Sequence, residues 1–184
     1  MSERILRQVG QVRCADGLEA LHRDRILAFV RAGGPLFDRN RYDPGHLTAS
    51  AFVVDDALER ILLVHHVRLG RWLQPGGHGE PGEDDLLAIA MREAREETGI
   101  DGLSLFGGED SPLDLDVHEI PERGAEPTHL HLDVRFLLVA PALAHPRASA
   151  ESHDAAWFPL GESAPGWDKG MRRAILKIRA RNPV

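Results

Sequence analysis

A glycine-rich turn followed by an acidic helix constrains this 184-residue chain more than any other feature. The turn begins at Gly76, and the predicted helix ends at Gly99, where a glycine is a common C-cap. Residues three and four apart share one face of a helix, so Glu93, Glu96 and Glu97 crowd together. Three like charges destabilise a helix unless a cation lies among them. Because Mg²⁺ and Mn²⁺ prefer oxygen ligands and readily keep water and substrate phosphate, the pattern predicts a divalent-cation site.

The same stretch resembles the signature of the Nudix hydrolases, glycine-x5-Glu-x7-Arg-Glu-apolar-x-Glu-Glu-x-Gly-apolar. The second half matches at every defined position: Arg92, Glu93, Ala94, Glu96, Glu97, Gly99 and Ile100. In the first half, Gly77 and Glu83 have the family spacing, but one extra residue separates Glu83 from Arg92. Counted back from Arg92, Asp84 takes the glutamate position instead. We favour Asp84 there, because an extra residue within a helix would rotate its face.

This resemblance implies an α/β Nudix fold, a mixed β-sheet sandwiched between α-helices. It also implies a hydrolase that cleaves a nucleoside diphosphate linked to another moiety, by attack of water on phosphorus. Glu93, Glu96 and Glu97 would hold Mg²⁺ or Mn²⁺, and the backbone carbonyl of Gly77 would add a ligand. Glu97 or Glu93 is also the expected general base.

Two more residues are expected to act at this site. Arg92 would orient a glutamate through a charge-assisted pair, the alternative being a plain surface arginine. Many Nudix enzymes supply a further catalytic glutamate from a later loop, and Glu151, shortly before Trp157, has a suitable position. The alternative for Glu151 is an ordinary exposed loop acid.

Other functions within the superfamily remain open as alternatives. One is a non-catalytic module that senses a nucleotide and regulates a partner. The other is an isopentenyl-diphosphate isomerase, which needs an active-site cysteine. The only cysteine here is Cys14, which is far from the signature in sequence and has no motif around it.

Residues 113–118 and 129–136 alternate apolar and polar side chains with period two, as strands with one polar face do. In the second segment the polar residues are His129, His131, Asp133 and Arg135. If the segments pair across the 121–128 loop, Asp114, Asp116 and His118 lie on the same side. Three interpretations of this face stay open: a substrate-binding wall, a Zn²⁺ site built on His-x-His, and a structural polar face. For the wall, Arg135 is the expected phosphate partner, because guanidinium binds phosphate in a bidentate manner.

The remaining elements follow from periodicity and turn residues. Strands are expected at 46–54, 60–66, 72–74, 103–107 and 156–160, with a hairpin turn at 55–57. The signature helix is expected at 84–98, and a last basic helix at 166–180. Strands mixed with helices indicate a layered α/β domain.

The chain divides into an N-terminal helical extension with its linker at 1–44 and a Nudix domain at 45–184. A helix is expected from Asp16 to Arg31, with Asp16 as its cap and Gly33-Gly34 at its end. Its apolar stripe must be covered, either by the rest of the chain or by a second subunit. We expect a homodimer.

Charge and composition limit the classes of partner that the chain can have. The net charge of −7 argues against a general nucleic-acid binder, which needs a basic surface. One cysteine excludes an internal disulfide and favours the cytoplasm. No apolar run approaches the roughly 18 residues of a membrane span, so a membrane partner is not expected. The expected partner is a small nucleoside diphosphate derivative.

Overall fold

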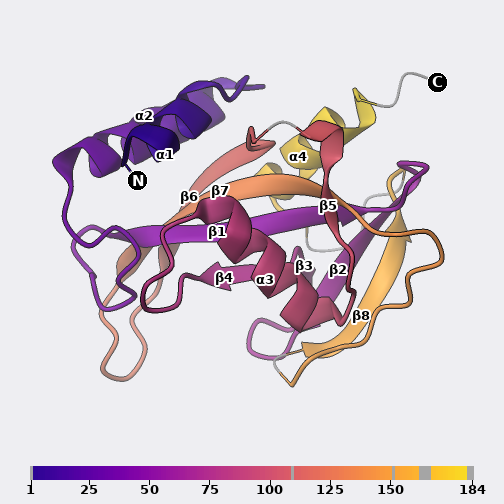
Figure 1. The fold of residues 1–184 in the computed structure, drawn as a ribbon. Coiled ribbons are helices and arrows are strands. Elements are labelled where there is room, and N and C mark those ends of the chain that lie inside the picture. The colour runs from indigo at the N-terminus through magenta and orange to yellow at the C-terminus, as the bar shows by residue number, and fades with distance from the viewer. Residues whose placement is uncertain (1, 109, 151, 162–166, 182–184) are drawn as a thin grey trace.

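The computed structural model describes residues 2–108, 110–150, 152–161 and 167–181, and it consists of one mixed sheet with helices on both faces (Figure 1). The strands are β1 (Gly45–Val54), β2 (Arg60–His66), β3 (Arg71–Leu73), β4 (Gly76–His78), β5 (Ser104–Leu105), β6 (Asp114–Ile120), β7 (His129–Val139) and β8 (Ser152–Pro159). The α-helices are α1 (Ser2–Gly10), α2 (Gly17–Ala32), α3 (Leu86–Thr98) and α4 (Lys169–Arg179). The α/β fold expected from the sequence is therefore confirmed.

The parallel pair of β1 and β7 forms the centre of the sheet, with Gly45 opposite Leu130 and Val54 opposite Val139. Strands β2 and β4 both pair with β1 in antiparallel fashion, while β5 and β6 pair with β7. Strands β3 and β8 complete the sheet beyond β2. The predicted hairpin of β6 and β7 is confirmed, and Asp116 lies opposite Asp133.

Strand β1 is buried along its whole length because helices cover both of its faces (Figure 1). Residues such as Leu47 and Val53 belong to the core that contains Ile89 of α3. On the other face, Phe52 belongs to the core that contains Met171 of α4. Alternate residues of one strand point to opposite faces, so β1 separates the two helical layers.

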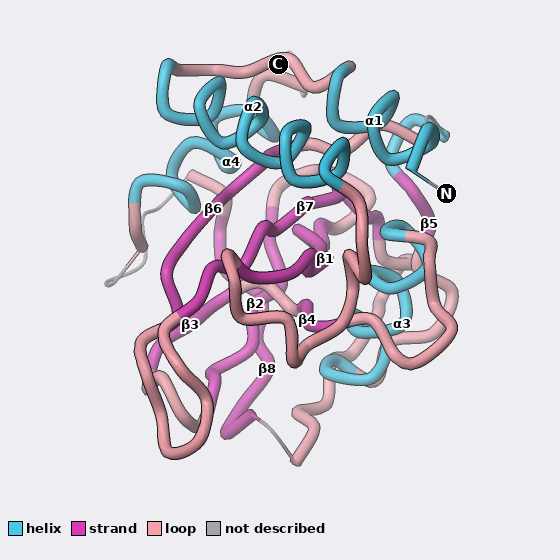
Figure 2. The backbone as a smooth tube through the Cα atoms, turned by 90° about the vertical axis from the view of Figure 1, so that its left-hand side faces the viewer, coloured by secondary structure: helices cyan, strands magenta, loops and turns pink. Residues whose placement is uncertain are grey.

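The N-terminal extension packs against its own sheet, beside β6 (Figure 2). Helix α2 is confirmed with Asp16 as its N-cap and Gly33 as its C-cap, whereas α1 was not predicted. The fully buried Glu19 of α2 accepts hydrogen bonds from Lys177 Nζ at 2.5 Å and from the Leu115 amide at 3.3 Å. The extension is thus joined to both β6 and α4 by buried polar contacts.

The apolar stripe of α2 is covered along most of its length by the chain itself. Ile26, Phe29 and Val30 are buried in the core shared with the sheet. Leu18 and Leu21, in the first turns of the helix, are 44% and 47% exposed. Among the described residues, no helix has the length and apolar character needed to cross a bilayer.

Two features of the glycine-rich segment differ from the prediction. The segment expected to be only a turn forms β4, which pairs with β1 at Thr48, Ala49 and Ser50. Helix α3 begins at Leu86, two residues later than expected, and Asp85 caps it by accepting from the Leu87 amide at 3.0 Å. The loop before α3 therefore absorbs the additional residue of the signature without rotating the helix.

Candidate active site

Strand β4 lies directly against the acidic face of α3. The Gly76 amide donates to Glu97 Oε2 at 3.1 Å. A Cβ atom placed on Gly77 would lie 2.8 Å from Glu93 Cδ and 2.9 Å from both of its oxygens. A side chain at Gly77 would therefore displace the Glu93 carboxylate from its present position.

Arg92 links the acidic residues of the signature into one cluster. Its Nη1 donates to Glu93 Oε1 and to Glu96 Oε2, both at 3.0 Å. Its Nη2 donates to the carbonyl oxygen of His78 at 2.9 Å, which ties α3 to β4. Glu83 accepts two more bonds, from Nε at 3.0 Å and from Nη2 at 2.9 Å. The expected pairing of Arg92 with a glutamate is present, and Arg92 contacts three carboxylates rather than one, those of Glu83, Glu93 and Glu96.

These contacts correct the choice of Asp84 as the first acid of the signature. Glu83 and Asp84 both lie in the loop before α3, so helical phase does not decide between them. Glu83 makes the bidentate contact with Arg92, while Asp84 is exposed. The hydrogen bonds from Arg92 lower the pKa of Glu83, against the opposing effect of partial burial. Glu83 therefore fills the acidic position.

The three glutamates differ in exposure, which gives the cluster an inner and an outer side. Glu97 is buried at 8% exposure, whereas the Glu96 side chain is 49% exposed. Glu93 is intermediate, at 17% for its side chain. The donor set is all oxygen and anionic, with a backbone strand close against it, and this set suits Mg²⁺ or Mn²⁺.

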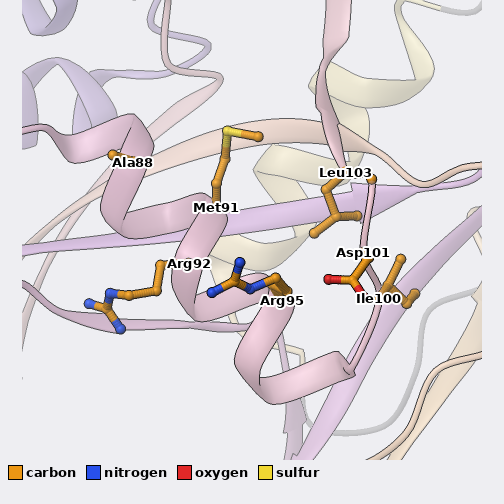
Figure 3. A pocket seen from close by; sticks show the side chains of 8 residues that line it. Ala88, Met91, Arg92, Arg95, Ile100, Asp101 and Leu103 are labelled. Atoms are coloured by element: carbon orange, nitrogen blue, oxygen red, sulfur yellow. The ribbon is translucent and has the colours of Figure 1, made fainter.

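A shallow hollow of about 350 Å³ lies beside the cluster, along α3 and the segment after it (Figure 3). Met91, Ile100 and Leu103 give it apolar walls, and Arg92 and Arg95 line it from α3. Arg92 belongs to both the hollow and the acidic cluster. A ligand held at the glutamates could therefore extend into this hollow.

The structure buries Arg135 within a network of carboxylates. Its guanidinium is 5% exposed and donates to Asp133 Oδ2 at 2.9 Å, Asp116 Oδ2 at 2.9 Å and Asp114 Oδ1 at 3.4 Å. Asp133 in turn accepts from Ser50 Oγ at 2.8 Å. Because Arg135 is committed to buried carboxylates, the phosphate-binding role expected for it is not retained, and neither is a substrate role for Asp133. The expected common face of β6 and β7 is present, with a structural ion network at this end.

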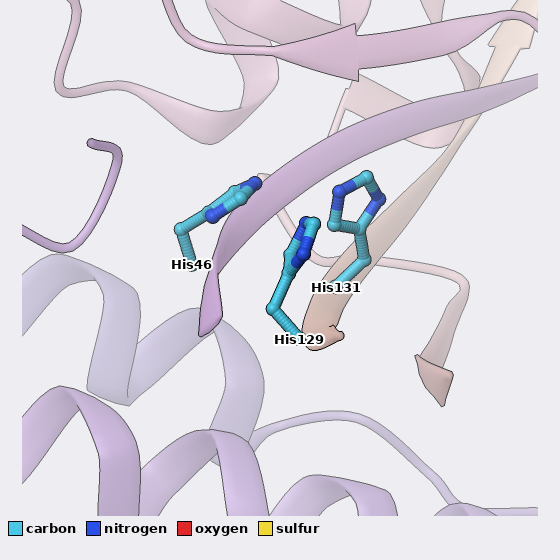
Figure 4. Close-up of side chains that lie close together, drawn as sticks. All are labelled: His46, His129 and His131. Atoms are coloured by element: carbon cyan, nitrogen blue, oxygen red, sulfur yellow. The ribbon is translucent and has the colours of Figure 1, made fainter. Parts of the chain in front are cut away.

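Four imidazoles occupy the other end of that polar face. His46 of β1, His129 and His131 of β7 offer ring nitrogens that all lie within 4.8 Å of one another (Figure 4). His78 of β4 joins them, with its Nε2 3.2 Å from His131 Nε2. Burial, reinforced by the neighbouring imidazoles, lowers the pKa of His78 to about 4 and that of His131 to about 2. Both rings are therefore neutral near pH 7.

Sequence reasoning grouped His129 with His131 but did not find His46 or His78 as their partners. Both lie on other strands, and only the pairing of β1 with β7 and with β4 brings them to this face. His131 lies directly opposite His46 in the register. The expected loop acid Glu151 lies outside the described residues.

The comparison with protein families assigns this fold and site to a class. The family model described as the NUDIX domain matches residues 44–178. The chain therefore belongs to the NUDIX family, and the acidic cluster of α3 is the part of the structure that carries the signature of that family.

Individual relatives match more locally. The bis(5'-nucleosyl)-tetraphosphatase [asymmetrical] of Mus musculus is 43% identical over 51 residues, which is 28% of this chain and 34% of that protein. The Rattus norvegicus protein of the same name is 41% identical over 54 residues, 29% of this chain and 36% of that protein. The chain thus spans about a third of the length of the curated relatives it matches.

Solved structures extend the likeness to the whole fold. A C. elegans Ap4A hydrolase binary complex has a TM-score of 0.57 at 19% identity, covering 73% of this chain and 96% of that one. A NUDIX-family hydrolase from Clostridium perfringens has a TM-score of 0.54 at 20% identity, covering 74% and 97%. At these identities the likeness concerns the fold.

Proposed function

We propose that this protein is a metal-dependent hydrolase that cleaves the diphosphate of a nucleoside diphosphate derivative by attack of water on phosphorus. The observation that carries the proposal is the acidic face of α3, where Arg92 binds Glu93 and Glu96 and the Gly76 amide of β4 donates to Glu97. The family and the tetraphosphatase relatives support it. The carboxylates and a diphosphate are both anionic and repel each other unless a cation lies between them. A divalent cation would therefore bind both the glutamates and the substrate.

Each residue of the cluster has a role that follows from its position. Glu93, Glu96 and Glu97 would hold Mg²⁺ or Mn²⁺, with the Gly77 carbonyl as a further ligand. The ion, when bound, neutralises the diphosphate and lowers the pKa of a coordinated water. Arg92 restrains two of these carboxylates and so fixes their separation.

Glu97 is the best placed general base among the glutamates. It is the most buried of the three. The Gly76 amide holds one of its oxygens at 3.1 Å and thereby fixes the direction of the other. Glu93 is the alternative base, and Glu151, which precedes β8 in the sequence, is a further candidate.

The nucleoside end of the substrate would occupy the hollow lined by Met91, Arg95, Ile100 and Leu103. Its apolar walls suit a base, and Arg95 suits a phosphate or ribose oxygen. Dinucleoside polyphosphates are the first substrates to test, because the named relatives act on that class. Nucleotide sugars and ADP-ribose carry the same diphosphate and belong in the same panel.

The proposal is tested by product release from this panel with and without Mg²⁺, using Glu96→Gln and Glu97→Gln. Both variants keep the side-chain shape, and we expect each to lower kcat about 10²-fold or more, since placement of the ion fails. Glu119→Gln, at an exposed position on β6, is the matched control and should retain full activity. Near-normal turnover in both site variants would overturn the proposal.

The same assay distinguishes the alternatives. A nucleotide-sensing module would bind a member of the panel by calorimetry without turning it over. The isomerase requires a cysteine at the site, whereas Cys14 lies in the N-terminal region, where Arg23 and Glu19 are among its charged neighbours.

A further inference from the structure

We propose a second cation site, separate from the glutamates, in which His46, His129 and His131 bind Zn²⁺. These three residues come from the paired strands β1 and β7 and point to the same face of the sheet (Figure 4). Their ligand atoms all lie within 4.8 Å of one another. Imidazole nitrogen suits zinc, whereas Mg²⁺ prefers oxygen, so this site would select a different ion from the acidic cluster.

Hydrogen bonds fix the direction in which two of the rings offer a lone pair. His46 Nδ1 lies 3.1 Å from the Arg41 carbonyl oxygen, and His129 Nδ1 lies 2.8 Å from the Pro127 carbonyl oxygen. A carbonyl oxygen can only accept, so each Nδ1 carries the proton and donates it. The Nε2 atom of each ring is then unprotonated and free to coordinate. Metal-binding histidines in proteins commonly have this outer hydrogen bond to a carbonyl.

His46 gives the second, independent indication of a ligand. Its side chain is fully buried, and its Nε2 has no hydrogen-bond partner among the described residues. An unsatisfied buried nitrogen costs about 1–3 kcal/mol, so a native structure rarely keeps one without a reason. A cation among the three rings would satisfy this atom, because its lone pair would become a metal bond.

The dimensions of the cluster fit a zinc ion after small ring movements. With Zn–N bonds of about 2.1 Å in a tetrahedron, ligand nitrogens lie roughly 3.4 Å apart. The observed upper limit of 4.8 Å thus requires a contraction of the order of an ångström, which side-chain torsions can supply without moving the strands. His78 Nε2, 3.2 Å from His131 Nε2, is a further imidazole nitrogen close to the three proposed ligands.

The cluster is also reachable from solvent. The contacts of His46 and His129 with backbone carbonyls already leave one unprotonated ring nitrogen on each residue. His131 and His78 are only half-buried, which leaves a route by which an ion enters.

The test is a zinc titration of the full-length protein after removal of metals, with Mg²⁺ in large excess to occupy the glutamates. Competition with a chromophoric chelator should show one tightly bound Zn²⁺ per chain. X-ray absorption at the zinc edge should show a nitrogen-only protein shell with the scattering pattern of imidazole. Thermal unfolding should shift to higher temperature on zinc addition, since a ligand that binds only the folded state stabilises it.

Three variants locate the site. His131→Gln, at a half-buried position, should lower zinc affinity by about 10²-fold or more. Loss of a residue that only hydrogen-bonds to a metal ligand typically lowers affinity about 10–100-fold, and loss of the ligand itself should lower it more. His145→Gln, at an exposed loop position, is the matched control and should bind as the original chain does. Glu97→Gln should also keep the zinc, whatever it does to hydrolysis, so this outcome is independent of the proposed activity.

Several results would overturn the site. The site would be overturned if folded His131→Gln protein bound zinc as tightly as the original chain. It would also be overturned if X-ray absorption showed oxygen ligands from the protein around the zinc. Loss of zinc in Glu97→Gln with retention in His131→Gln would assign the ion to the acidic cluster instead. A circular dichroism spectrum for each variant establishes that it is folded before its affinity is compared.

Discussion

The contact between Glu83 and Arg92 makes a sharp prediction, because the neighbouring Asp84 serves as an internal control. Replacing Glu83 by Gln keeps the shape of the side chain and removes its charge. Hydrogen bonds to charged groups contribute about 1.5–3 kcal/mol, whereas exposed pairs contribute roughly 0–1 kcal/mol. With the Glu83 side chain 26% exposed and Arg92 16%, we expect a loss between these ranges, about 1.5 kcal/mol.

For a chain of this length, 1 kcal/mol corresponds to about 2–4 °C in Tm, so Glu83→Gln should lower Tm by roughly 3–6 °C. Thermal unfolding followed by circular dichroism at pH 7 measures this directly. Asp84→Asn removes the same charge one residue later, at an exposed position, and should change stability by less than about 0.5 kcal/mol. Equal Tm values for the two variants, or a larger drop for Asp84→Asn, would refute the assignment of Glu83.

The pH dependence of that difference gives a second check. Because Arg92 lowers the pKa of Glu83 in the folded chain, the stabilisation is fully present above the ordinary carboxyl pKa of about 4.3. It is lost as pH falls through the lowered folded value. The Tm difference between the original chain and Glu83→Gln should therefore stay constant from pH 7 to about pH 5 and shrink below about pH 4.

The other predictions concern the strand beside the glutamates, the buried ion network and the oligomeric state. Gly77→Ala puts a Cβ 2.8 Å from Glu93 Cδ, so it should lower kcat in the substrate panel, while Gly17→Ala, with open space at its Cβ and far from the site in sequence, should alter turnover less. Arg135→Met removes the guanidinium that Asp133, Asp116 and Asp114 share, although Asp114 keeps its contact with Arg173. It should cost about 3–5 kcal/mol in urea unfolding, against less than about 0.5 kcal/mol for the exposed Arg68→Met. If Leu18 and Leu21 form a dimer contact, light scattering at micromolar concentration should give twice the chain mass, and Leu21→Glu should give the monomer; a monomeric original chain would refute the dimer.

Local sequence signals predicted most of the elements, because each of them acts within a few residues. Asp16 caps α2 as expected, and Asp85 shows that the same chemistry sets the start of α3. The alternation in β6 and β7 predicted their common polar face, including Asp116 opposite Asp133. Short-range periodicity and capping are thus sufficient where the segment is long enough to show them.

Errors arose where a residue's role depends on distant partners. Glu83 was passed over because the start of the helix was placed too early, and one residue of loop changes which acid can reach Arg92. Arg135 was expected to bind phosphate because it lies on the polar face of its strand. Asp114 and Asp116 from β6 compensate its charge, and their proximity is a property of the strand pairing.

The two candidate cation sites share strand β4, and this arrangement follows from the geometry of a strand. Successive residues of a strand point to opposite faces, so Gly77 lies toward Glu93 while His78 lies toward His131. The His78 carbonyl also accepts from Arg92, so the backbone that positions the imidazole restrains the acidic cluster as well. A three-residue strand therefore separates an oxygen-only site from a nitrogen-only site. Because hard ions prefer oxygen ligands and zinc prefers imidazole nitrogen, we expect the two proposed sites to bind their ions independently even though both adjoin one short strand.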